Sequence, residues 1–128
     1  MRLAIILASM LLWGTTAQAQ YLSRAAPSGK PIKLGFASTT NPDCTAVGET
    51  TVRVVQGPRH GRVDILKTRD FPTFSQTNIR SVCNTRRVPG TLARYVSHRG
   101  FVGYDYLTLE VISANGVARR SSFAINVR

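Results

Sequence analysis

Apolar side chains recur at every second position in several short segments of this chain, and this spacing constrains its fold most strongly. In the last segment, residues 117–127, Phe123, Ile125 and Val127 alternate with small or polar residues. Alternation of period two is typical of a β-strand that buries one face. Beyond residue 20, no apolar stripe of helical spacing has a useful length. The sequence therefore predicts an all-β fold.

Six or seven short strands are expected from this pattern. Besides the last, the strand candidates are 31–36, 50–56, 62–66, 92–97 and 106–113. The turn residues 57–61 predict a hairpin that joins the second candidate to the third. Asn115-Gly116 predicts a hairpin with a type I′ turn before the last strand. Short strands at this spacing indicate an antiparallel β-sandwich.

Two segments lack a clear strand pattern. Residues 20–30, rich in Ser, Ala, Pro and Gly, are predicted to form a flexible N-terminal arm ahead of one domain over 31–128. Residues 67–88 are predicted to form a long connection with a short strand near Ile79–Cys83.

The N-terminus has the features of a secretory signal peptide over residues 1–19. Arg2 is followed by a mostly apolar run at 3–13, and Ala17-Gln18-Ala19 matches a cleavage site. The run is shorter than the roughly 20 residues that span a bilayer. We expect a periplasmic or secreted protein whose mature chain begins at Gln20 and has no transmembrane segment.

Cys44 and Cys83 are the two cysteines. In an oxidising compartment, such a pair predicts one disulfide. The alternative, a metal or nucleophile pair, is disfavoured because the two lie far apart in sequence and two ligands do not make a zinc site.

Basic residues greatly outnumber acidic ones. The 17 Lys and Arg against 6 Asp and Glu give a formal net charge of +11. Such a balance favours anionic partners.

Two segments carry a resemblance to a known family. Residues 55–63, VQGPRHGRV, resemble the P-x-H-G-x-V hairpin of bacterial Ig-like and cadherin-like extracellular modules. Residues 100–111, GFVGYDYLTLEV, resemble the later G-F-x-G-x-D stretch of the same modules. The resemblance implies an Ig-like β-sandwich with a structural or interaction role outside the cytoplasm.

The second motif is expected to be a structural turn. Gly100 and Gly103 can adopt positive φ, Phe101 can fold beneath the turn, and Asp105 can accept the backbone N–H bonds that the turn leaves open. The alternative is a calcium site. Calcium needs six to eight oxygen ligands, and the six carboxylates of this basic chain are dispersed. We therefore predict no metal and no cofactor.

Candidates for catalysis are few. His60 and His98 are the only histidines, and neither has a carboxylate at a telling spacing. Both cysteines are assigned to the disulfide. The sequence predicts a non-enzymatic protein with no catalytic residues.

Arginines supply the remaining functional signal. Five of them, with no acidic residue among them, fall within 20 residues: Arg80, Arg86, Arg87, Arg94 and Arg99. Arginine matches carboxylate, phosphate and sulfate geometry, so they are candidates for an anion-binding face for envelope polysaccharide or anionic lipid. The competing interpretation is a solvated, solubilising surface. Nucleic acid is not expected as the natural partner, and an inhibitor or accessory subunit using residues 69–89 is a further alternative.

Overall fold

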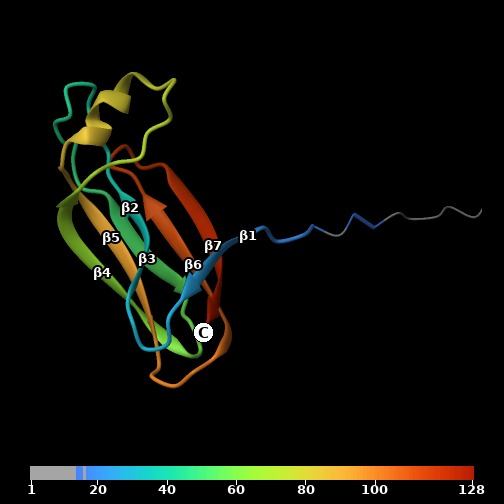
Figure 1. The fold of residues 1–128 in the computed structure, drawn as a ribbon. Coiled ribbons are helices and arrows are strands. Elements are labelled where there is room, and N and C mark those ends of the chain that lie inside the picture. The colour runs from blue at the N-terminus through green and yellow to red at the C-terminus, as the bar shows by residue number, and fades with distance from the viewer. Residues whose placement is uncertain (1–13, 16) are drawn as a thin grey trace, which may run out of the picture.

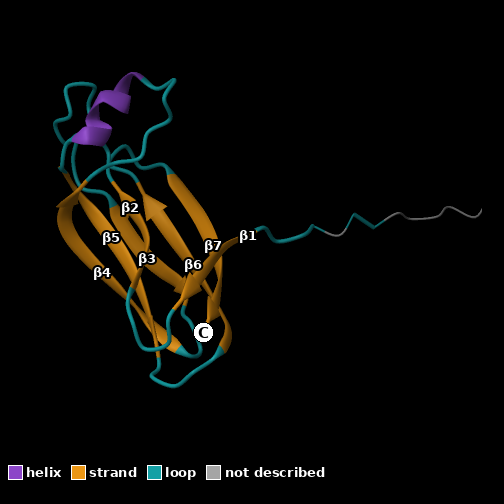
Figure 2. Ribbon diagram, in the orientation of Figure 1, coloured by secondary structure: helices purple, strands orange, loops and turns teal. Residues whose placement is uncertain are grey.

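The computed structural model describes residues 14, 15 and 17–128. Those residues form seven strands and one short 3-10 helix, η1 (Figure 2). In chain order these are β1 (Tyr21–Ala26), β2 (Ile32–Ala37), β3 (Thr51–Gln56), β4 (Gly61–Asp70), η1 (Ile79–Thr85), β5 (Val88–Ser97), β6 (Gly103–Ile112) and β7 (Ala118–Val127). The predicted all-β class is confirmed.

Two sheets make up the sandwich (Figure 1). One has the order β1-β7-β6-β3 and the other β2-β5-β4. All neighbouring strands are antiparallel except β1 and β7, which are parallel. If the strands are lettered A to G in chain order, the sheets hold G-F-C and B-E-D, the division found in immunoglobulin-type sandwiches. Here β1, which would be strand A, lies beside β7 (strand G) and not in the sheet with strands B, E and D.

The core lies between the sheets and follows the predicted alternation. From β7, Phe123, Ile125 and Val127 are buried, whereas the residues between them are half-buried. Leu107 and Leu109 of the neighbouring strand β6 belong to the same cluster. Burying a large apolar side chain contributes about 1.5–3 kcal/mol, so one-sided alternation on several strands is enough to hold two sheets together.

The predicted hairpin over residues 50–66 is wrong. Its strands exist, but β3 pairs with β6 and β4 pairs with β5, so the connection crosses from one sheet to the other. The backbone N–H groups of Arg59 and His60 in this connection donate to the side chain of Asp105 in β6. The turn is thus held across the sandwich, by a partner that local sequence does not reveal.

Residues 20–30 were predicted to form a flexible N-terminal arm, and this prediction is wrong for most of the segment. Residues 21–26 form β1, which runs parallel to β7 from the Tyr21–Ser122 pair to the Ala26–Val127 pair. Of its six side chains only that of Ala26 is buried. The strand is held mainly by backbone pairing to a neighbour, and therefore has no clear alternation in its sequence.

The long connection also differs from expectation. β4 continues to Asp70, and residues near Ile79–Cys83 form η1 instead of a strand. The side chain of Asn78 accepts a hydrogen bond from the Arg80 N–H at 2.8 Å, a typical helix N-cap. This cap favours a helical turn over an extended segment.

The hairpin at Asn115-Gly116 is confirmed, but its turn is not type I′. Among the described non-glycine residues only Cys44 has positive φ, so Asn115 does not meet the type I′ requirement. Gly116, with φ 86°, donates its N–H to the Ser113 carbonyl, and the Ser113 N–H reaches the Val117 carbonyl. The connection is therefore longer than a two-residue type I′ loop, and a glycine of positive φ follows its turn.

The predicted signal peptide lies largely outside the described residues. Of its 19 residues, only 14, 15 and 17–19 are described. In the described part of the chain, no helix is long and apolar enough to cross a membrane.

Candidate functional site

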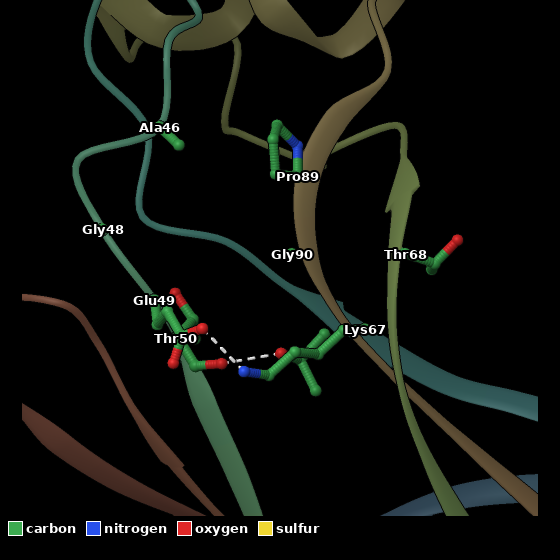
Figure 3. Close-up of a pocket in the computed structure, with 9 residues that line it drawn as sticks. Ala46, Gly48, Glu49, Thr50, Lys67, Thr68, Pro89 and Gly90 are labelled. Atoms are coloured by element: carbon green, nitrogen blue, oxygen red, sulfur yellow. Dashed lines mark hydrogen bonds and ion pairs between the residues drawn. The ribbon is translucent and has the colours of Figure 1, made fainter.

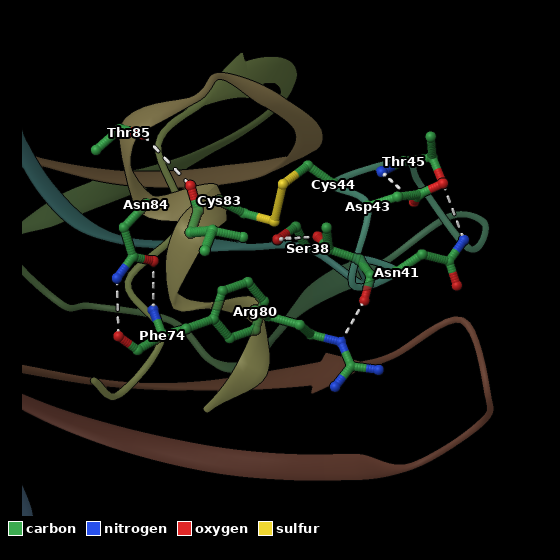
Figure 4. The surroundings of a disulfide bond; sticks show 12 residues. Ser38, Asn41, Asp43, Cys44, Thr45, Phe74, Arg80, Cys83, Asn84 and Thr85 are labelled. Atoms are coloured by element: carbon green, nitrogen blue, oxygen red, sulfur yellow. Dashed lines mark hydrogen bonds between the residues drawn. A yellow bond between two sulfur atoms is a disulfide. The ribbon is translucent and has the colours of Figure 1, made fainter. Parts of the chain in front are cut away.

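One end of the sandwich is built from loops that a disulfide joins (Figure 4). Cys44, in the β2–β3 loop, is bonded to Cys83 of η1, as predicted. Asn84 fastens the preceding segment to η1, because its side chain accepts from the Phe74 N–H at 2.8 Å and donates to the Phe74 carbonyl at 2.9 Å. We call this region the disulfide end.

Threonines link the loops of the disulfide end to the sheets. The Thr39 and Thr50 hydroxyls lie 2.8 Å apart, and the Thr39 hydroxyl also accepts from the Ala114 N–H at 2.9 Å. The buried Thr91 hydroxyl of β5 donates to the Thr50 carbonyl at 2.6 Å. The β2–β3 and β6–β7 loops are therefore held in a defined position.

A groove of about 670 Å³ lies between these loops. Its lining consists of hydroxyl, amide, apolar and arginine side chains and contains no carboxylate. We call it the arginine groove; it is lined by Ser38, Thr39, Thr40, Val47, Phe74, Asn78, Arg80, Val111, Ser113, Asn115, Val117 and Arg119.

Arg80 is positioned on both its backbone and its side chain. Its N–H is bound by the Asn78 cap. Its Nε donates to the Thr40 carbonyl at 2.6 Å, the bond that the dashed line from Arg80 marks in Figure 4. The two Nη groups make no hydrogen bond to a described residue. Because a guanidinium has five N–H donors in a planar fork, most of its donors remain available in the groove.

Arg119 is the second arginine of the groove and was not among the five arginines predicted from the sequence. On β7 it has the same parity as the buried Phe123 and Ile125, so it belongs to the inward-facing series, at the end where the core gives way to the groove. It makes no hydrogen bond or ion pair with the described residues. The parity of β7 in the sequence was the signal that could have identified it.

The adjacent Arg120 has the opposite parity and a different role. On the outer face of the sheet, its Nε lies 3.0 Å from one oxygen of Glu110, and the Arg53 Nε lies 2.7 Å from the other. The hydrogen bond from Arg120, helped by Arg53, lowers the pKa of Glu110 below its usual range. The charge of Arg120 is thus compensated by the carboxylate of Glu110.

The five predicted arginines do not share one face. Arg80 lines the groove, whereas Arg86 and Arg87 follow η1 outside it, with the Arg87 guanidinium 5.4 Å from the centre of the Phe71 ring. Arg94 lies along β5, in register with Lys33 and Asp64. Arg99 follows the end of β5, and a ten-residue strand spans about 33 Å. A strand separates sequence neighbours along its length, so closeness in sequence was misleading here.

A second hollow offers a contrast (Figure 3). It measures about 430 Å³ and lies beside Gly90 of β5. Its lysine, Lys67, is bound to Glu49 at 2.7 Å, and this hydrogen bond lowers the pKa of the Glu49 carboxyl. The lysine charge is therefore compensated, unlike the arginines of the groove.

The glycine-aspartate motif is a structural junction. The carboxylate of the buried Asp105 accepts from the N–H groups of Arg59, His60 and Tyr106 at 3.0–3.1 Å and from the Tyr95 hydroxyl at 2.7 Å. Burial, followed by this bond to Asp105, raises the pKa of Tyr95 above its usual range. Asp105 is an acceptor as predicted, but most of its donors come from the β3–β4 connection and β5, not from the 100–103 turn.

The two sequence motifs meet at this junction. The Phe101 ring stacks on the His60 ring with centres 4.1 Å apart, and a Cβ on Gly103 would lie 3.4 Å from the Phe101 ring. A Cβ on Gly61 would lie 2.4 Å from the Val96 carbonyl oxygen. In the described part of the chain no three His, Cys, Asp or Glu side chains are grouped as metal ligands. His60 and Asp105 thus have structural partners.

Comparisons with known proteins add no relative. No protein-family model matches the chain, and no curated protein or solved structure shows significant similarity to it. The resemblance to bacterial Ig-like modules therefore stays a prediction.

Proposed function

We propose that the protein is an exported, non-enzymatic interaction module of the cell envelope, and that it binds anionic groups of an envelope polyanion in the arginine groove. The observation that carries this proposal is the pairing of Arg80 and Arg119 in a groove without a carboxylate. Arginine forks bind phosphate, sulfate and carboxylate bidentately. The net charge of +11 attracts a polyanion to the molecule, and the groove supplies a defined place for it.

The disulfide end also supports a protein partner. Ile79 and Val82 of η1 are 70% and 62% exposed, and because side chains three residues apart eclipse one another in a 3-10 helix, the two lie on the same side of η1. This observation favours the second candidate function, an inhibitor or accessory subunit that presents residues 69–89.

Binding of inorganic polyphosphate tests the groove without a sugar ring or a lipid chain. Replacing both arginines (Arg80→Gln with Arg119→Gln) should weaken binding about ten-fold or more, because each removes charge-assisted hydrogen bonds. The measurement is a titration at about 0.15 M salt, where the Debye length is roughly 8 Å. Arg119→Gln alone should weaken binding in the same direction without disturbing a hydrogen bond of the fold.

The matched control removes two arginines outside the groove. Arg86→Gln with Arg99→Gln changes the net charge by the same amount and should weaken binding by no more than about three-fold. Equal losses in the two double variants, at unchanged melting temperature, would show diffuse electrostatic attraction and contradict the proposed site.

A further inference from the structure

We propose that a second binding site, independent of the arginine groove, takes a sugar ring of an acidic polysaccharide. Three tyrosines form it on the outer face of the four-stranded sheet. Tyr21 of β1 and Tyr104 and Tyr106 of β6 are 49%, 59% and 47% exposed. We call this set the tyrosine face. It lies near the start of β6, whereas the arginine groove lies at the end of that strand.

The strand order brings these side chains together. Tyr104 and Tyr106 are two residues apart on β6 and therefore point to the same face. β7 separates β6 from β1, and its residue opposite Tyr106 is the small Ala124. The Tyr21 ring can therefore reach across β7, and it meets the Tyr106 ring edge-on with centres 5.5 Å apart. Tyr104 and Tyr106 are nearly parallel, with centres 6.4 Å apart.

This geometry leaves a single aromatic platform. The Tyr106 ring has two aromatic neighbours, Tyr21 and Tyr104, while the Tyr104 ring meets only Tyr106 among the described rings. A sugar ring has one apolar C–H face and a rim of hydroxyls, and tyrosine offers a matching apolar face and polar tip. Single-stranded nucleic acid would need a succession of platforms for its bases. One free ring face thus favours a sugar.

A hollow of about 360 Å³ lies beside the platform and supplies polar groups. Its volume is at the small end of the range for ligand sites. Gln56 offers an amide for sugar hydroxyls, and Arg59 offers a guanidinium that is not paired with any described residue. Asp105 also lines the hollow, but it is buried and already accepts four hydrogen bonds. An acidic sugar is therefore favoured over a neutral one.

Arg59 is held in place through its backbone. Its N–H donates to Asp105 at 3.0 Å, which fixes the base of the side chain at the rim of the hollow. A carboxylate on a ring stacked against Tyr104 is the class of anion that Arg59 can bind bidentately. A uronic acid combines such a ring with such a carboxylate.

The test is a titration with a short oligogalacturonate, followed by tyrosine fluorescence. The chain has four tyrosines and one tryptophan, Trp13, so the chain from Gln20 has only tyrosine emission. Three of the four tyrosines belong to the tyrosine face, and the fourth, Tyr95, is buried. We expect a saturable change in emission. Tyr104→Leu should weaken affinity about ten-fold, and Tyr104→Phe, which keeps the ring, should stay within about two-fold of the wild type.

Two further variants make the test specific. Arg59→Gln should reduce the preference for oligogalacturonate over its methyl ester, and Arg119→Gln should leave the oligogalacturonate-induced change in tyrosine emission unchanged even if polyphosphate binding is lost. Absence of saturable binding, or equal binding by wild type and Tyr104→Leu at unchanged melting temperature, would overturn the proposal. Tighter binding of oligothymidylate at about 0.15 M salt would assign the face to nucleic acid. Self-association that Tyr104→Leu abolishes would assign it to a second copy.

Discussion

At the residue scale, Asp105 connects more of the structure than any other polar side chain that we describe. It accepts from two N–H groups of the β3–β4 connection and from the Tyr95 hydroxyl of the opposite sheet. A buried donor that loses its partner costs about 1–3 kcal/mol. The carboxylate is therefore needed to satisfy its neighbours, which explains its burial in a basic protein.

Asp105→Ala should lower the free energy of unfolding by about 2–4 kcal/mol, because the buried Tyr95 hydroxyl and three part-buried N–H groups lose their acceptor together. Denaturant unfolding measures this loss. Asp64→Ala is the matched control: Asp64 forms an exposed pair with Arg62 at 3.2 Å, and such a pair contributes about 0–1 kcal/mol. Calcium should leave the melting temperature of the wild type unchanged; a marked rise with calcium would contradict the structural role of Asp105.

At the scale of elements, η1 depends on a few attachments. They are the bond between Cys44 and Cys83, the two hydrogen bonds of Asn84 to Phe74, and the bond from Arg80 to the Thr40 carbonyl. Arg80 lies three residues before Cys83, so the disulfide positions one of the two arginines of the groove. Breaking the disulfide should therefore lower the stability of the fold and weaken anion binding in the groove at the same time.

Replacing both cysteines with serine should lower stability by about 3–4 kcal/mol, because the bond closes a loop of about 40 residues. Polyphosphate binding should weaken under conditions where the variant is still folded, whereas the change in tyrosine emission with oligogalacturonate should persist. Unfolding curves and titrations of the two proteins measure these effects. Two freely alkylated thiols in wild-type protein from an oxidising compartment would contradict the bond itself.

At the scale of the whole molecule, the first strand lies close to the predicted cleavage site. β1 begins at Tyr21, one residue after Gln20. Cleavage after Ala19 would leave β1 complete, with Tyr21 in place at the tyrosine face. A cut within β1 would instead leave the edge of β7 unpaired. An unpaired edge strand is prone to pair with another chain.

We therefore expect the mature protein to begin at Gln20. The intact mass of protein recovered from the exported fraction measures this directly. If the mass corresponds to a chain that still contains Met1, export by a cleaved signal peptide is contradicted. If it corresponds to a chain that begins beyond Tyr21, a role for β1 in the mature fold is contradicted.

Much of the fold was predictable because it depends on local pattern. The alternation of Phe123, Ile125 and Val127 determines which face of β7 is buried, and two cysteines allow only one intramolecular disulfide. Local pattern did not reveal β1, since its residues are held by pairing to β7 and not by a buried face. It also did not place the β3–β4 connection, whose N–H donors are satisfied by Asp105, 45 and 46 residues away.

The candidate sites divide in the same way. The sequence by itself determined that the surface is strongly basic and that Arg119 and Arg120 face opposite sides of a strand. Only the tertiary structure decided that Arg80 and Arg119 meet in one groove, that Arg99 lies far from them, and that Tyr21 joins the other two tyrosines. The physical reason is that period-two spacing assigns a side chain to a face, whereas strand order and packing decide which faces and ends come together.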